Sequence, residues 1–390
     1  MTKEQDIFLS IVKDYIHGSK HEEYETTEWK KILEHSRSHQ LTAIVYAQCR
    51  AIIPKDFAEE FRAVYLATIS TNVKRRKISN TILTLLKECG VGCFTVKGNN
   101  IACYYPNWEY RTMGDTDIVV NDLEKAHSVL RGNGFQGISK TKDREYQYSI
   151  QNMEFELHDR MVYEEAINLD STTVFLNNYQ AYVFDDRLDE SFHFIYILNH
   201  LRKHFMNSGV EFRQFVDVAV MVKNNTNIDW RWTEEKLKEI GLLSFAKTVF
   251  YYIDRWFGVV APIASTEVSE DVFETSTDYI FDNGVFGFDN VANKDYLIAN
   301  TVRNAKNHKL AMLKSAMQKL FPSYKAMIAS KTYSFLVEKP ILLPIAWIYR
   351  FAREIKNKGF SKGKKLILES FVSTQYIEKR EEMFRSWGLE

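Results

Sequence analysis

Two carboxylates, Asp115 and Asp117, lie two positions apart at the start of the apolar run 115–120 (DTDIVV), directly after Gly114. Side chains alternate between the two faces of a strand, so we expect both carboxylates on one face, at the strand end beside a glycine turn. Paired carboxylates are the hard oxygen ligands that Mg²⁺ prefers, usually together with waters and substrate phosphates. This spacing predicts a divalent metal site; the alternative is a solvated strand end next to a turn.

A third acidic residue is expected on a neighbouring strand. The segment 152–158 (NMEFELH) alternates strictly and places Glu154, Glu156 and His158 on its polar face. A third carboxylate would complete a two-metal site, in which ions about 3.5–4 Å apart clamp both oxygens of a phosphoryl displacement. We predict that Glu156 supplies it, with Glu154 as the alternative. His158 either positions the glutamate, contacts a phosphate or is a surface histidine.

Two basic residues precede the aspartates. The β-rich run 91–96 (VGCFTV) ends at Lys97-Gly98, where a short helix is expected to begin. A glycine there lets the backbone approach a triphosphate, and N–H groups at a helix start attract anions. Lys97 either binds phosphate or caps the strand end. Arg111 either contacts phosphate through its planar guanidinium or forms a salt bridge with Asp115 or Glu109 that orders its loop.

Four more polar residues occur in pairs at helical spacing later in the chain. His200 and His204 are four positions apart, and so are Arg213 and Asp217. No glutamate follows the first histidine as in HExxH, so a zinc protease is not expected. Arg213 and Asp217 most simply form an intrahelical ion pair. We predict a structural, interdomain role for all four residues.

The elements that position these residues form a small α/β unit between helical segments. Strands are expected at 91–96, 115–120, 145–150 and 152–158, with helices throughout 1–89 and at 99–105, 121–132, 193–206, 212–222, 234–240, 243–257, 309–319 and 361–387. The polar stretch 264–293 is expected to be a connection. We predict an α+β protein, mostly helical, with a helical region at 1–89, a small mixed-sheet unit at 90–185 and a helical domain at 186–390.

Composition excludes several classes of function. Lys plus Arg total 51 and Asp plus Glu total 51, so the basic surplus typical of proteins that bind duplex nucleic acid is missing. The 4 cysteines show no zinc spacing and are expected to be reduced. The N-terminus lacks a signal-peptide pattern, and the apolar run 340–349 is too short to span a bilayer. We expect a cytoplasmic protein without a membrane span.

The order of these features resembles the DNA polymerase beta-like nucleotidyltransferase superfamily, in which a glycine-containing turn precedes a D-x-D strand and a later third carboxylate. Within it, the chain resembles a bacterial family of uncharacterised nucleotidyltransferases. The matching stretches are Val96-Lys97-Gly98, Tyr105-Pro106, Arg111-x-x-Gly114-Asp115-x-Asp117, Glu156-Leu157-His158 and His200-x-x-x-His204…Arg213-x-x-x-Asp217, with weaker matches at Phe321-Pro322-Ser323 and in the PILLPIAWIYR segment. One departure is Asn99, which follows Gly98 where the superfamily commonly has Ser or Gly.

The resemblance implies a metal-dependent enzyme that moves an NMP from an NTP such as ATP to a hydroxyl or similar acceptor and releases pyrophosphate. Asp115 and Asp117 would bind Mg²⁺ or Mn²⁺ with the NTP, Glu156 would hold the catalytic ion, and Asn99 would replace the missing serine as a phosphate ligand. The resemblance also allows His158 and the two helical pairs to line the cleft. Two alternatives stay open: an inert fold used for interaction, as in toxin–antitoxin systems, and a metal-dependent phosphohydrolase.

Overall fold

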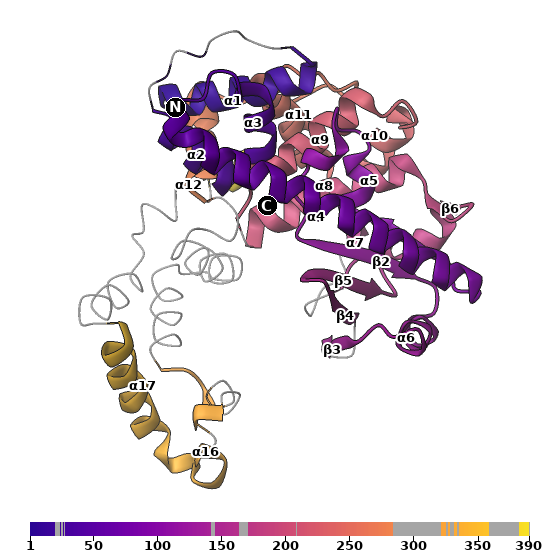
Figure 1. Ribbon diagram of the computed structural model, residues 1–390, viewed down its shortest axis with the longest axis vertical. Coiled ribbons are helices and arrows are strands. Elements are labelled where there is room, and N and C mark those ends of the chain that lie inside the picture. Colours follow the sequence, from indigo (N-terminus) through magenta and orange to yellow (C-terminus); the bar gives the residue numbers. More distant parts are fainter. Residues whose placement is uncertain are drawn as a thin grey trace. The chain divides into compact units, whose positions relative to one another are not determined.

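The chain of the computed structural model divides into two compact units. Figure 1 shows the helices and strands of the described residues. The structure describes residues 1–19, 24, 26, 28–141, 145–163, 171–207, 209–283, 321–324, 327, 331–333, 335–358 and 382–389. The first unit comprises Met1–Phe205, Val210–Val285 and Ser386–Glu390, and the second comprises Met206–Gly209 and Phe286–Arg385. Every candidate site residue lies in the first unit. The predicted division at residues 90 and 186 stays a prediction.

The N-terminal part is helical, as its apolar periodicity predicts. Its helices are α1 (Lys3–His17), α2 (Trp29–Ser38), α3 (Thr42–Cys49) and α4 (Lys55–Glu88). A reciprocal capping box between Thr2 and Gln5 starts α1. The long helix α4 ends where Gly90 takes a left-handed backbone with φ of +69°, a conformation that costs glycine little. The chain then turns into the sheet.

A mixed five-stranded sheet forms the centre of the first unit. Its strands are β1 (Cys93–Val96), β2 (Asp115–Val120), β3 (Gly137–Thr141), β4 (Glu145–Ile150) and β5 (Met153–His158), in the order β1-β2-β5-β4-β3. Strands β2 and β5 are parallel, and the other neighbours are antiparallel. The α+β class and the mixed sheet are therefore confirmed. Strand β3 was not predicted, because its sequence GISKT is short and mostly polar.

Short helices connect the first strands. Between β1 and β2 lie α5 (Gly98–Ala102) and the 3-10 turn η1 (Trp108–Tyr110). Helix α6 (Leu123–Gly132) follows β2 and begins at Asp122, whose carboxylate accepts a hydrogen bond from the Lys125 amide.

One face of the sheet is apolar and packs on α4 and α6. Ile118 of β2 and Phe155 and Leu157 of β5 are fully buried in a core with Leu86 of α4 and Leu130 of α6. Because side chains alternate along a strand, the residues between them project to the opposite face. The apolar pattern that builds this core therefore also fixes where the acidic side chains of β2 and β5 must lie.

Helices return after the sheet. These elements are α7 (Ser171–Asn177), η2 (Tyr179–Tyr182), β6 (Val183–Phe184), β7 (Arg187–Leu188), α8 (Glu190–Asn207), α9 (Phe212–Asn224), α10 (Trp230–Glu239), α11 (Leu243–Phe257) and α12 (Glu270–Asn283). The interpretation of 264–293 as a connection is wrong for α12. Phe273, Ile280 and Phe281 recur at helical spacing there and are buried, which outweighs the polar composition of the stretch.

The predicted helix 309–319 and most of 361–387 lie outside the described residues. At the end of the latter, Trp387 is fully buried and stacks on Tyr252, with ring centroids 4.3 Å apart. In the second unit, η3 (Lys331–Tyr333), α16 (Phe335–Glu338), η4 (Pro340–Leu342) and α17 (Leu343–Lys358) are described. Over the described parts of the chain, no helix is both long and apolar enough to cross a bilayer.

Candidate metal centre

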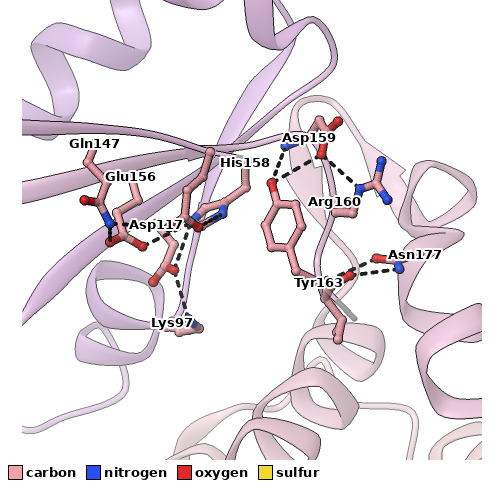
Figure 2. Close-up of polar contacts among 11 residues, drawn as sticks. Lys97, Asp117, Gln147, Glu156, His158, Asp159, Arg160, Tyr163 and Asn177 are labelled. Atoms are coloured by element: carbon pink, nitrogen blue, oxygen red, sulfur yellow. Dashed lines mark hydrogen bonds and ion pairs between the residues drawn. The ribbon is translucent and has the colours of Figure 1, made fainter. Parts of the chain in front are cut away.

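The acidic face of the sheet brings three metal-binding groups together. In the parallel pairing of β2 with β5, Asp117 lies opposite Glu156 and Asp115 lies opposite Glu154. Asp117, Glu156 and His158 each offer one ligand atom, and these three atoms lie within 4.8 Å of one another (Figure 2). Asp117 is only 5% exposed. The strand alternation that predicted a shared face for these side chains is thus seen in the structure.

Lys97 supplies a positive charge to this group. It directly follows β1, which pairs with β2 so that Val96 lies opposite Asp117. Its Nζ donates a hydrogen bond of 2.9 Å to Asp117 Oδ1 (Figure 2). Lys97 also has a φ of +57°, which is rare for a residue with a side chain. This backbone turns the chain from β1 directly into α5, so the lysine stands at the point where the strand meets the helix.

Gly98 packs closely against Met113. A Cβ atom at this position would lie 3.1 Å from Met113 Sδ. Asn99 points away from the acidic face, because its side-chain amide donates a 3.0 Å hydrogen bond to Ser79 Oγ of α4. The turn therefore presents Lys97 to the acidic group, while Asn99 anchors α5 to the long helix.

Burial and neighbouring charges shift the pKa values of the acidic and basic groups in the cluster. Burial raises the pKa of Asp117, but the charges of Lys97 and His158 outweigh it and hold that pKa well below its usual range. Burial also raises the pKa of Asp115, as does the neighbouring Asp117. Burial lowers the pKa of His158, but its interactions with Asp117 and Glu156 outweigh this and raise it to about 9. Asp117 is therefore the permanently charged centre of the group.

Two side chains of β4 contact the cluster residues of β5. Gln147 and Glu145 lie opposite Glu156 and His158 in the antiparallel pairing. Gln147 Nε2 donates a 3.0 Å hydrogen bond to Glu156 Oε1, and Glu145 Oε2 lies 3.5 Å from His158 Nδ1. Neither residue was identified from the sequence. Their role depends on strand register, which the spacing of residues within one strand does not reveal.

A pocket of about 180 Å³ opens onto the cluster. Helix α8 forms one wall with Tyr196, Asn199, His200 and Lys203. The Tyr196 ring centroid lies 6.0 Å from Lys97 Nζ, and burial raises the pKa of its hydroxyl to about 12. Only His200 was predicted. The helical spacing of Tyr196 and Lys203 from His200 could have indicated these two of the remaining three.

His200 and His204 contact each other rather than a common set of metal ligands. Their Nε2 atoms are 3.0 Å apart. Burial lowers the pKa of both, that of His204 to about 4, so both rings are neutral and one donates to the other. Among the described residues, neither histidine joins a group of three metal-binding side chains. Their predicted structural role stays a prediction.

A smaller pocket, of about 70 Å³, adjoins the first. Lys97, Asp115 and His200 line both pockets. The smaller one is also lined by Gly98, Arg111, Arg213 and Asp217. The structure therefore gathers all predicted site residues except Asn99 and His204 around two adjoining pockets.

Arg111 ties the loop before β2 to helix α9. Its Nε and Nη2 donate hydrogen bonds of 2.7 Å to the two oxygens of Asp217, and the side chains are 4% and 5% exposed. Tyr105 donates a third, of 2.6 Å, to the same carboxylate. Neither suggested salt-bridge partner of Arg111, Asp115 or Glu109, is the one observed. Arg213 lies 3.7 Å from Asp217 as predicted but hydrogen-bonds Glu211.

We expect Asp217→Asn to destabilise the protein by about 3–5 kcal/mol, because the buried guanidinium of Arg111 loses its counterion. Urea unfolding followed by fluorescence measures this. The control is Glu235→Gln, which breaks the exposed pair with Arg231 and should cost less than about 0.5 kcal/mol. Equal unfolding free energies for both variants would contradict a supporting role for the Arg111–Asp217 pair.

The fold and the site together define a class of protein. A mixed sheet carries a D-x-D strand, a parallel neighbour with a further carboxylate, and a Lys-Gly turn next to both, with helices before and after. This is the arrangement of a nucleotidyltransferase-like α+β unit. The chain belongs to a family described as uncharacterised nucleotidyltransferases, whose model matches residues 25–258. No curated protein and no solved structure matches the chain.

Proposed function

We propose that the protein transfers an NMP from an NTP to a hydroxyl or similar acceptor and releases pyrophosphate. The observation that carries this is the placement of Asp115, Asp117 and Glu156 on two parallel neighbouring strands, at one pocket, in a chain of a nucleotidyltransferase family. Asp115 and Asp117 would hold divalent ions with the nucleotide, and Glu156 with Asp117 would hold the catalytic ion. Such ions stabilise charge on phosphate oxygens and favour deprotonation of the attacking hydroxyl.

The residues around the carboxylates have matching roles in this proposal. Lys97 lines both pockets and would neutralise phosphate charge once its ammonium leaves Asp117. Glu156, fixed by Gln147, keeps its other oxygen directed at the cluster, where it would hold the catalytic ion and so help to activate the acceptor hydroxyl. The two adjoining pockets suit a reaction with two substrates, since the reacting groups must meet at their shared residues.

The test is incubation of the protein with NTPs labelled at the α-phosphate, in cell extract, with Mg²⁺ or Mn²⁺. We expect label to appear in an acceptor and to disappear with Asp117→Asn. Release of labelled nucleotide without incorporation would instead show a phosphohydrolase. Failure to bind any NTP, by calorimetry with the folded protein, would show an inert fold used for interaction.

A further inference from the structure

The Nε2 atom of His158 is aimed into the acidic cluster, where it contacts two carboxylates without forming a hydrogen bond to either. It lies 3.2 Å from Asp117 Oδ1 and 3.5 Å from Glu156 Oε2. Neither contact has hydrogen-bond geometry, and within the described residues this buried nitrogen has no other partner. The residue is only 8% exposed. Buried polar atoms are nearly always hydrogen-bonded, so a buried nitrogen that faces two carboxylates without a hydrogen bond points to a group bound between them.

The surroundings of His158 match those of a histidine that binds metal. A ligating imidazole usually presents its other ring nitrogen to a carboxylate or carbonyl, which fixes its orientation. Here Glu145 Oε2 lies 3.5 Å from His158 Nδ1. The neighbouring ligand is held in the same way, because Gln147 donates to Glu156. Both supporting residues come from β4, directly opposite the residues that they support.

We propose that His158 Nε2 is a metal ligand together with Asp117 and Glu156, so that this ion is held by nitrogen and oxygen atoms and Mn²⁺ is preferred to Mg²⁺. Mg²⁺ is bound almost entirely by oxygen, whereas imidazole favours transition metals, and affinities rise along the series from Mn²⁺. Glu145 and Gln147 are positioning residues in this site. The proposal specifies the metal of the proposed function, but it is tested with metal alone.

The competing explanation is that His158 serves only as a positive counterion to the two carboxylates. A counterion would leave no nitrogen in the coordination shell of a bound ion. Mn²⁺ distinguishes the two, because pulsed electron paramagnetic resonance detects a directly bound imidazole nitrogen. The signal does not depend on nucleotide, acceptor or turnover.

The experiment adds MnCl₂ to the full chain and records the nitrogen coupling and the binding affinity. We expect an imidazole coupling in the parent protein and its loss in His158→Gln. Mn²⁺ affinity should fall at least 10-fold, since changing even an outer partner of a ligand typically costs about 10–100-fold. Mg²⁺ affinity should change much less. The control is His127→Gln, since His127 on α6 contacts Tyr148, outside the cluster.

A second variant is needed in case His158→Gln does not fold. His158→Asp keeps a metal-binding side chain but removes the nitrogen, so it should bind Mn²⁺ without the coupling. Absence of the coupling in the parent protein, or its persistence in a folded variant without His158, would overturn the proposal. Nitrogen coupling without NMP transfer would leave His158 assigned and refute the proposed function. NMP transfer without nitrogen coupling would support the proposed function and refute the assignment of His158 as a ligand.

Discussion

Asp117→Asn should abolish the binding of Mn²⁺ and of Mg·NTP. Among the described residues, Asp117 is the carboxylate that lies next to Lys97 and His158 and opposite Glu156, so an ion at this face needs its charge. Loss of an outer partner of a ligand weakens metal binding about 10- to 100-fold, and loss of the central ligand should exceed 100-fold. Isothermal titration with MnCl₂, and with Mg²⁺ plus a non-hydrolysable NTP, measures both effects.

The same variant should be less stable when no metal is present. Lys97 would then lose the carboxylate that accepts its hydrogen bond, and its ammonium would face a neutral amide instead. The matched control is Glu154→Gln, which removes one negative charge from the same strand face but from outside the three-residue group. Titration curves for Asp117→Asn that overlay those of the parent protein would refute the metal assignment.

Glu156→Gln should keep nucleotide affinity near that of the parent and lose at least about 10²-fold in turnover, the scale typical of lost acid–base assistance. The nucleotide would be held mainly by Asp115, Asp117 and Lys97, whereas Glu156 would help to activate the attacking hydroxyl. The loss should therefore appear in kcat rather than in KM. Single-turnover transfer of labelled NMP, alongside calorimetric NTP binding, separates the two quantities.

Glu154→Gln is again the control, and we expect it to be close to silent. Residues two apart on a strand differ by about 6.5–7 Å along its axis, so Glu154 and Glu156 cannot both serve one ion. In the structure, Glu154 lies opposite Asp115 and Glu156 lies opposite Asp117. A large loss in Glu154→Gln with normal turnover in Glu156→Gln would reverse the assignment of the third carboxylate.

Local patterns were sufficient for the parts of the fold that depend on neighbours in sequence. The alternation in DTDIVV and NMEFELH placed apolar residues on one face and carboxylates on the other, as the buried Ile118 and Phe155 confirm. Helix α12 was missed because its few apolar residues are surrounded by Asp, Ser and Thr. Strand β3 was missed because only pairing with β4 stabilises such a polar segment.

Contacts between distant residues limited what could be said of the site. Asp217 is 106 positions from Arg111, and nothing in the sequence connects the two. Likewise, Gln147 and Glu145 become relevant only through the register of β4 with β5. The sequence could name the residue types on each strand, but the partner of a charged side chain is decided by which elements pack together.

Lys97 gives Asp117 a counterion that belongs to the chain itself. Small domains that rely on a metal for folding are unfolded by chelators, because metal binding supplies their folding free energy. Here the cation that neutralises Asp117 is part of the chain and stands at a fixed turn between β1 and α5. Folding should therefore not depend on a metal ion, and a chelator should leave the protein folded. An ion bound at the proposed site could then be removed and restored without putting the fold at risk.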